Sequence, residues 1–166
     1  MTPIETLPLR TVLVLVSYHH KNTEKVARTM ADVLDAPIMS PKEIRSDVIS
    51  DYDLIGFGSG IYDGMHHKAL LDLADRLPGT EGKKVFLFST SAIVNDDKVA
   101  KDHTALRNRL QQKGYQIVDE FACKGLDTNS FLKYFGGLNK GRPNKEDLEL
   151  AEKFANNLMK RELGKT

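Results

Sequence analysis

Near the start of the chain, a run of apolar positions gives way to a helical repeat after a short polar stretch. Thr11–Val16 form a continuous and largely β-branched run, which favours a strand buried on both faces, as in a parallel sheet. Beyond it, apolar residues recur at spacings of three and four, which predicts the buried face of an amphipathic helix. These residues are Val26, Ala27, Met30, Val33 and Leu34. The polar stretch Ser17–Thr23 therefore joins the end of a buried strand to the start of a helix.

This polar stretch has the chemistry of an anion-binding loop. Asn22 and Thr23 are good N-cap residues, and Glu24 is an acid in the first helical turn. The first amides of a helix lack partners within the helix, and the helix dipole favours negative charge at that end. A buried strand, a short polar loop and a helix N-terminus together predict a binding site for an anion such as a phosphate group.

The same alternation of strand and helix patterns continues along the chain. Four more short apolar runs predict strands, at Ala36–Met39, Tyr52–Phe57, Val85–Phe88 and Tyr115–Cys123. Helical patterns lie between and after them, at Pro41–Ser50, from His66 to Leu77, at Lys101–Lys113 and after Asn144. This order predicts one α/β domain over residues 1–166, with three layers around a five-stranded parallel sheet. Right-handed crossovers and a binding loop after the first strand favour the strand order 2-1-3-4-5.

Three polar or glycine-rich loops are expected to meet at one edge of this sheet. In sheets of this order the ligand lies beyond the carboxyl ends of strands one and three, where the winding direction reverses. That edge brings together Ser17–Thr23, Gly58–Gly64 and Ser89–Asn95. Gly58 and Gly60 have two interpretations: they let the chain approach a flat ring closely, or they serve only a sharp turn.

The first loop resembles the phosphate-binding loop of the flavodoxin family. Asn22 and the segment Thr23–Ala27 match the end of that pattern, whereas its beginning departs from it. Tyr18 and His20 stand where the family usually has hydroxyl residues, and Lys21 stands where glycine is usual. All three side chains can still donate hydrogen bonds to a phosphate. In architecture the resemblance covers nearly the whole chain, and it implies the flavodoxin-like fold.

This resemblance implies a protein that binds FMN noncovalently and transfers electrons, with the cofactor supplying the chemistry. The residues implied to hold the phosphate are Ser17, Tyr18, His19, His20, Lys21, Asn22 and Thr23. Those implied to surround the flavin ring are Gly58, Ser59, Gly60, Ile61, Tyr62, Asp63, Thr90, Ser91, Ala92 and Ile93. No catalytic residue is implied. Tyr62 has two interpretations, stacking on the ring and packing within its own loop.

Two histidine pairs, His19-His20 and His66-His67, lie on loops that this fold brings together. Adjacent histidines point apart on a strand or a helix, and no carboxylate or cysteine stands at a recognisable ligand spacing. We therefore expect no metal site. Instead, we expect His19 and His20 to belong to the phosphate loop, and His66 or His67 to close the flavin crevice.

Two further segments leave other functions open. Gly64–His67 resembles a loop of the quinone-dependent protoporphyrinogen oxidases. Gly125–Pro143 resembles a tail of small flavodoxin-family proteins that have no assigned function. One alternative is therefore a flavin-dependent reductase or oxidase of a quinone or a porphyrinogen. The other is a flavin-free binding module of the same fold.

Composition limits the classes of partner and the cellular compartment that we expect. The chain has 24 Lys and Arg against 23 Asp and Glu, without a long block of one sign, so we expect neither nucleic acid nor a membrane as its partner. Cys123 is the only cysteine, which excludes an internal disulfide and fits a reducing cytoplasm. Residues 1–9 lack the features of a signal peptide, and we expect a short mobile leader. The expected partner is a redox protein or a small-molecule electron acceptor.

Overall fold

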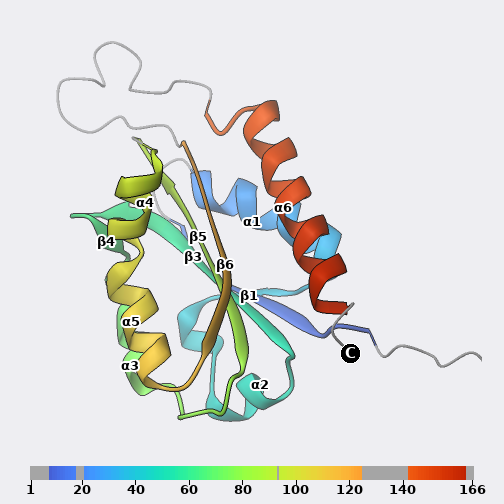
Figure 1. Cartoon of the computed structure of the whole chain (residues 1–166), viewed down its shortest axis with the longest axis vertical. Coiled ribbons are helices and arrows are strands. Elements are labelled where there is room, and N and C mark those ends of the chain that lie inside the picture. The colour runs from blue at the N-terminus through green and yellow to red at the C-terminus, as the bar shows by residue number, and fades with distance from the viewer. Residues whose placement is uncertain (1–7, 18–20, 93, 125–141, 164–166) are drawn as a thin grey trace, which may run out of the picture.

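The computed structural model describes residues 8–17, 21–92, 94–124 and 142–163. Its centre is a parallel sheet in the order β2-β1-β3-β5-β6, with β4 paired antiparallel to the end of β3 (Figure 1). The strands are β1 (Thr11–Val16), β2 (Ile38–Met39), β3 (Leu54–Tyr62), β4 (Met65–His66), β5 (Lys84–Ser91) and β6 (Gln116–Lys124). Without the small β4, this is the order 2-1-3-4-5, so the predicted α/β flavodoxin-like fold is confirmed.

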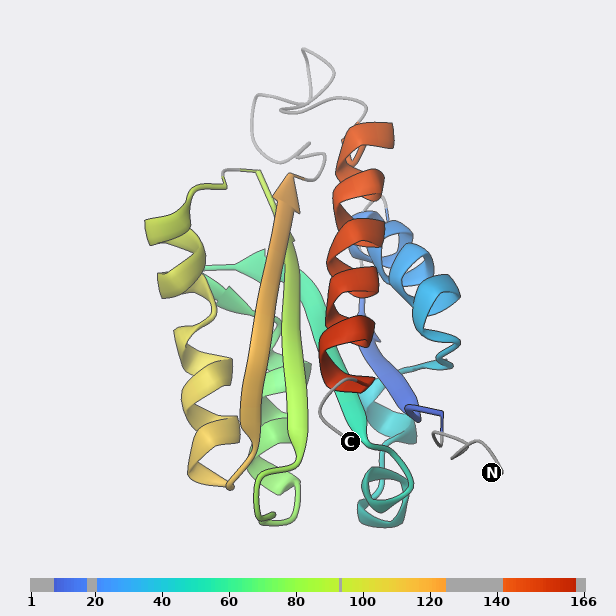
Figure 2. The same ribbon diagram turned by 45° about the vertical axis from the view of Figure 1, so that its right-hand side comes forward.

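Helices cover both faces of the sheet, which makes the three layers visible in Figure 2. One face carries α1 (Asn22–Leu34) and α6 (Lys145–Leu163). The other carries α3 (Lys68–Arg76), α4 (Asp96–Asp102) and α5 (Thr104–Gln112). The short η1 (Pro41–Glu43) and α2 (Ser46–Ser50) add buried residues to the core on this second side.

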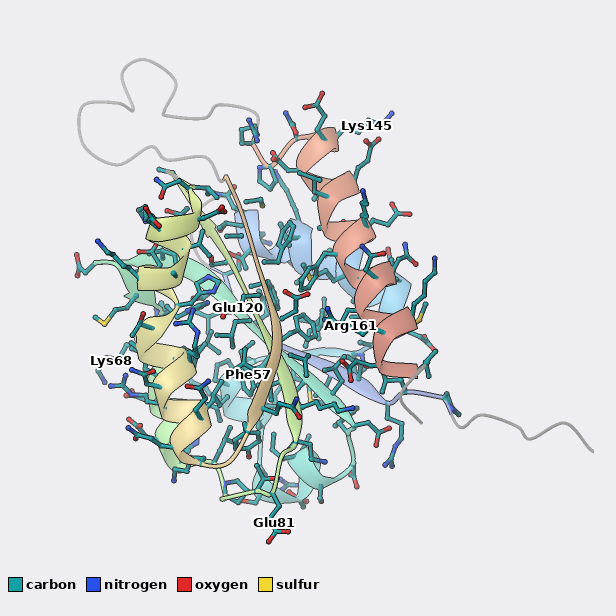
Figure 3. The ribbon with its side chains drawn as sticks, viewed as in Figure 1. Phe57, Lys68, Glu81, Glu120, Lys145 and Arg161 are labelled. Carbon is teal, nitrogen blue, oxygen red and sulfur yellow. The ribbon has the colours of Figure 1, made fainter. Side chains whose placement is uncertain are left out.

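The strands divide the apolar core between the two faces because successive side chains of a strand point to opposite sides. Along β5, Phe86 and Phe88 belong to the core under α1 and α6. Val85 and Leu87 belong to the core under α3 and α5, together with Phe57, which Figure 3 shows inside the molecule. All five side chains are fully buried. The central strands are thus apolar on both faces, as the continuous hydrophobic runs predict.

Two strands extend further than the sequence pattern predicts. The third strand was expected to end at Phe57, but β3 continues through Gly58–Gly60 to Tyr62. Likewise, Ser89–Ser91 belong to β5 and not to a loop after it. The physical reason is strand pairing. Ser59 pairs with Ser89 of β5 on one side and with Val16 of β1 on the other. Inter-strand hydrogen bonds hold these segments extended, although their residues are small and polar.

The helix predicted at Lys101–Lys113 corresponds largely to α5, and the separate helix α4 precedes it, so that the two helices meet at His103. The side chain of His103 turns into the protein and bonds to Ser89 and Glu120. The second strand is shorter than predicted, and the last helix starts after Asn144 as predicted. No helix in the described ranges is long and apolar enough to cross a membrane.

Candidate functional site

The start of α1 is tied to the end of β1 at the carboxyl edge of the sheet. Lys21 occupies the N-cap of α1 in the left-handed conformation, with φ 53° and ψ 36°. Asn22 is then the first helical residue, so the prediction that it caps the helix is wrong. Ser17 makes this connection, because its Oγ accepts a hydrogen bond from the Glu24 amide at 3.3 Å. Lys21 therefore has the backbone conformation that usually calls for glycine.

The first two residues of α1 face inward. Asn22 is 9% exposed and Thr23 is 2% exposed. The Thr23 hydroxyl lies 2.8 Å from the hydroxyl of Thr90 on β5. A hydroxyl both donates and accepts, so each of these groups retains hydrogen-bonding capacity beyond this contact. The structure thus joins two of the three segments that the sequence places around one crevice.

The charges at the mouth of this turn are partly paired. The Lys21 ammonium lies 4.0 Å from the Glu24 carboxylate, and Arg28 contacts the same carboxylate at 2.8 Å. The hydrogen bond from Arg28 is the main cause that lowers the pKa of Glu24; burial opposes it, and the attraction of Arg28 and then of Lys21 adds to the lowering. Two cations face one carboxylate here, so the turn carries an excess of positive charge beside a helix N-terminus, which favours an anion. The other predicted residues of this loop, Tyr18, His19 and His20, lie outside the described residues, as does Ile93.

Gly58 contributes to the core and does not line a loop. A Cβ added at Gly58 would come within 2.0 Å of the Phe88 ring, so the ring occupies the space of the missing side chain. The predicted reason for this glycine, close approach of a bound ring, is therefore replaced by the packing of Phe88. At Gly60 an added Cβ would lie 3.4 Å from the ring of Tyr62, an ordinary contact distance.

The turn between β3 and β4 places Tyr62 at the edge of the predicted site. The Tyr62 ring packs over Gly60 and meets the His67 ring edge-on, with the centroids 5.2 Å apart. Asp63 has φ 51° and forms the turn with a glycine that follows it. Ser59 is buried, and its hydroxyl accepts from the His67 amide at 2.9 Å. Tyr62 is half-buried and remains a candidate to contact a ligand, as do Ile61, Ser91 and Ala92 at the same edge.

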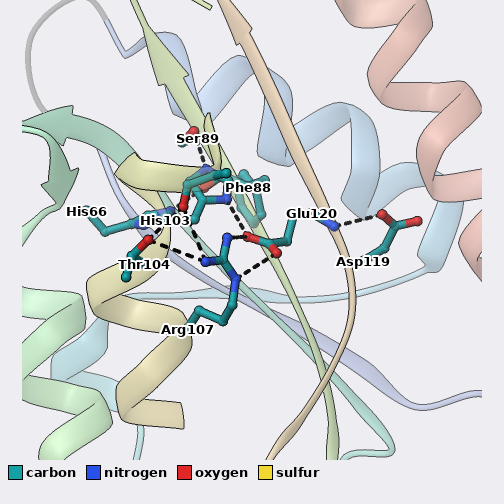
Figure 4. Close-up of polar contacts among 9 residues, drawn as sticks. His66, Phe88, Ser89, His103, Thr104, Arg107, Asp119 and Glu120 are labelled. Atoms are coloured by element: carbon teal, nitrogen blue, oxygen red, sulfur yellow. Dashed lines mark hydrogen bonds and ion pairs between the residues drawn. The ribbon is translucent and has the colours of Figure 1, made fainter. Parts of the chain in front are cut away.

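A chain of buried polar contacts lies beneath this edge, and the sequence did not reveal it (Figure 4). The Ser89 hydroxyl is 2.7 Å from Nε2 of His103, and Nδ1 of His103 is 2.8 Å from the Glu120 carboxylate. Arg107 holds that carboxylate with two hydrogen bonds, at 2.7 and 2.9 Å. These four residues, which we call the His103 network, tie β5 and β6 to the α4–α5 junction. They are scattered along the sequence, so no local motif could have indicated them.

The protonation of the His103 network follows from its contacts. Burial raises the pKa of Glu120, but the hydrogen bonds from His103 and Arg107 outweigh it and lower this pKa to about 2. An ionised carboxylate only accepts, so we assign a proton to Nδ1 of His103. The other ring nitrogen, Nε2, is the hydrogen-bond partner of the Ser89 hydroxyl.

The spacing of these groups matches a Ser–His–acid triad, but their burial does not suit a nucleophile. Ser89 is 1% exposed and His103 is 0% exposed, so no substrate reaches the hydroxyl. Activation of a serine requires access to an acyl group as well as a neighbouring base. The His103 network therefore anchors the α4–α5 junction.

His66 and His67 have separate positions. His66 is 1% exposed, its Nε2 donates to the Phe88 carbonyl at 3.1 Å, and its Nδ1 has no hydrogen-bond partner among the described residues. Burial, and then the neighbouring His103, lowers the pKa of His66 to about 3, so the ring is neutral. Of the two histidines expected to close a crevice, His66 does not face one, because its ring is packed inside the protein. His67 caps α3 by accepting from the Ala69 amide at 2.9 Å, and its ring beside Tyr62 stays at the edge.

Two other features of the described part of the chain stand apart from this edge. No three His, Cys, Asp or Glu side chains gather there as metal ligands would. A hollow of about 820 Å³ lies at the opposite, amino end of the strands, between Arg10, Asp53, Lys84 and Glu162. Its cations are already occupied, because Arg10 pairs with Asp53 and Lys84 pairs with Glu162. The carboxyl edge is therefore the better candidate site.

Comparison with known proteins gives a consistent picture. The Flavodoxin domain family matches residues 13–157. An uncharacterised protein of Methanocaldococcus jannaschii is 44% identical over 152 residues, which cover 92% of this chain and 99% of that protein.

Solved structures share the fold. Oxidised flavodoxin 2 from Bacillus cereus has a TM-score of 0.64 at 21% identity, covering 88% of this chain and 94% of that one. General stress protein 14 from Treponema denticola, solved in complex with FMN, has a TM-score of 0.59 at 11% identity, and the match covers 92% of this chain and 98% of that one. Because the family match covers most of the sequence and the archaeal relative matches over nearly its whole length, the chain belongs to the flavodoxin family.

Proposed function

We propose that this protein binds FMN noncovalently at the carboxyl edge of the sheet and serves in electron transfer. The observation that carries the proposal is the left-handed conformation of Lys21 at the N-cap of α1, the helix that follows β1 in the chain. A turn of this kind directs helix amides and side-chain donors toward one point, where a phosphate would be held. Membership of the flavodoxin family supports the same function, and a neighbour of the same fold was solved with FMN.

The residues around this turn fit a phosphate group. Thr23 and Ser17 offer hydroxyl groups, and Lys21 and Arg28 provide the local excess of positive charge. Lys21 supplies an ammonium on a side chain that is 76% exposed, so it can move toward a ligand without breaking a buried contact. A bound FMN would supply a ring that accepts and releases electrons, while the protein would supply binding and orientation.

The ring is proposed to lie between the turn after β3 and the end of β5. Thr90 links this region to the phosphate turn through Thr23, so the two halves of the proposed site share one buried contact. Tyr62 and His67 form an aromatic pair on the β3 side. Aromatic side chains are suited to contact a flat ring through its face or edge.

The direct test is binding. The purified protein is titrated with FMN and with riboflavin, which lacks the phosphate, while absorption and flavin fluorescence are recorded. We expect FMN to bind more tightly than riboflavin, since only FMN can use the Lys21 turn. Absence of FMN binding would contradict the proposal and would favour the flavin-free binding module.

A pair of threonine variants locates the phosphate. Thr23→Ala is expected to weaken FMN binding by about 1–3 kcal/mol, the scale of a hydrogen bond to a charged group, and to affect riboflavin much less. Thr29→Ala is the matched control, because Thr29 lies on the same helix and its hydroxyl bonds only to the Lys25 carbonyl. Equal losses for both ligands would remove Thr23 from the phosphate site.

Electron transfer and enzyme activity are separated by turnover. An electron carrier exchanges electrons with a partner, whereas a reductase also turns over a substrate at steady state. The FMN-loaded protein is therefore assayed with a nicotinamide donor and a quinone. We expect negligible steady-state turnover, and sustained quinone reduction would instead support the reductase alternative.

A further inference from the structure

Lys98 brings a cation to the end of β5, a position that no sequence pattern indicates. Its Nζ lies 3.3 Å from the Ser91 hydroxyl and forms an ion pair with Asp102, one helical turn further along α4. The Lys98 side chain is 31% exposed, whereas the Asp102 side chain is 7% exposed. The ammonium is thus held from within the protein and remains accessible from the carboxyl edge.

Both ends of α4 are fixed, which determines where Lys98 lies. At the N-terminus, the Asn95 side chain accepts from the Lys98 amide at 2.9 Å. At the C-terminus, the next residue after Asp102 is His103, which is bonded to Ser89 and to Glu120. Because Ser89 and Ser91 belong to the same strand, the His103 network keeps α4 in place beside the end of β5. Figure 4 shows these contacts from the helix junction to β6.

The Lys98–Asp102 pair spans the two segments proposed to hold the ring. Its positive end touches Ser91 on β5. Its negative end faces the turn after β3, where Oδ1 of Asp102 lies 3.9 Å from the position of a Cβ on Gly64. The carboxylate orients the ammonium through an i, i+4 contact, so the side chain is preorganised without help from a ligand.

We propose that Lys98 is a ring-facing cation that favours the reduced form of the bound flavin, an inference that rests on the proposed FMN function. Reduction adds negative charge to the ring, and a nearby fixed cation stabilises the more negative state. The interaction is stronger in a partly buried site than at an open surface, because water screens it less. Lys98 therefore raises the reduction potential of the bound flavin.

The test uses two lysines of the same helix. Lys98→Met and Lys101→Met remove the same charge from α4, but Lys101 is exposed to solvent. For each variant, FMN affinity is measured in the oxidised and in the reduced state, and the midpoint potential is measured by redox titration. We expect Lys98→Met to weaken binding of reduced FMN about tenfold more than binding of oxidised FMN, with a correspondingly lower potential. Lys101→Met should leave the ratio of the affinities for reduced and oxidised FMN unchanged. Lys98→Arg, which keeps the positive charge, should give a ratio close to that of the parent protein.

The outcomes separate this inference from the function on which it rests. If the parent protein does not bind FMN, the proposed function fails and the inference fails with it. If FMN binds and Lys98→Met behaves like Lys101→Met, the function stands and Lys98 has no special role. Thermal unfolding without FMN shows whether each variant is folded, and Lys98→Gln replaces Lys98→Met if the methionine variant unfolds.

Discussion

The two faces of the sheet are packed by different means, although the same strands build both. Under α1 and α6, rings of β5 fill spaces left by glycines of β3. An added Cβ at Gly56 would lie 2.4 Å from Phe86, and one at Gly58 would lie 2.0 Å from Phe88. Under α3 and α5, the core includes Leu87 but turns polar at Ser89, where the His103 network begins.

The difference shows how each face tolerates change. The face under α1 and α6 is packed by closely fitting apolar side chains and has little empty space. An added methyl group therefore lowers stability there, while pH has little effect on stability. A face that contains a buried polar network tolerates changes of shape better than the loss of one partner, because an unpaired buried group is costly. Both faces reach the proposed site, the polar one through His103 and α4 and the other through the contact of Thr23 with Thr90.

The largest effect is expected at the glycine under Phe88. Gly58→Ala should lower the free energy of unfolding by about 3 kcal/mol or more, because the added methyl group and the ring cannot occupy one space. Gly60→Ala is the matched control, since its Cβ would make an ordinary contact with Tyr62. Urea unfolding of both variants gives the difference. Similar values for the two glycines would show that the rings move aside easily.

Loss of the central histidine comes next. His103→Leu should cost about 2–3 kcal/mol of unfolding free energy, because the buried Ser89 hydroxyl loses its partner and the Glu120 carboxylate keeps only its hydrogen bonds from Arg107. Ser89→Ala removes one contact of the same network and should cost about 1 kcal/mol. Thermal and urea unfolding measure both variants. A His103→Leu variant as stable as the parent would mean that the network contributes no net stability.

The polar face should also make stability depend on pH in two steps. The folded pKa of His66 is about 3, below the ordinary value of 6.5, so between these values only the unfolded chain binds the proton. Stability should therefore fall as the pH drops from 6.5, by about 2 kcal/mol at pH 5. The folded pKa of Glu120 is about 2, below its ordinary value of 4.5. Glu120 therefore adds a further loss of stability, which starts near pH 4.5 and continues as the pH falls toward 2.

Two variants assign these steps. His66→Leu should remove the loss between pH 6.5 and 5, and Glu120→Gln should reduce the loss at lower pH. Urea unfolding at a series of pH values measures the slopes. If the unfolding free energy of His66→Leu changes with pH above pH 5 as steeply as that of the parent protein, a group other than His66 binds the proton.

The smallest effect concerns a polar contact on the face under α1 and α6. Thr90→Val should cost about 0.5–1.5 kcal/mol, because the buried Thr23 hydroxyl loses its partner at 2.8 Å. The same change should also weaken FMN binding if the two hydroxyls link the halves of the site. Thr104→Val is the control, since that hydroxyl is exposed and its contacts are to the Ala100 carbonyl of α4 and to Arg107, away from Thr23 and Thr90. Equal stability of Thr90→Val and the parent would show that water replaces the lost contact.

The sequence by itself determined the architecture. The β-branched run at Thr11–Val16 and the helical repeat after it were confirmed as β1 and α1. The strand order also followed, because the alternation of elements and right-handed crossovers leave few arrangements of a parallel sheet. These features depend on local periodicity and on chain connectivity, both of which can be inferred without knowing any contact.

Only the tertiary structure decided what individual residues do. Gly58 seemed suited to a ligand ring, yet Phe88, thirty residues later, fills its space. His103 seemed to be one more residue of a long helix, yet it breaks that helix to reach Ser89 and Glu120. Lys21, which departs from the expected glycine, nonetheless has the glycine-like backbone conformation. Such roles arise from contacts between distant segments, and a local pattern of apolar and polar residues carries no information about which partner a side chain will meet.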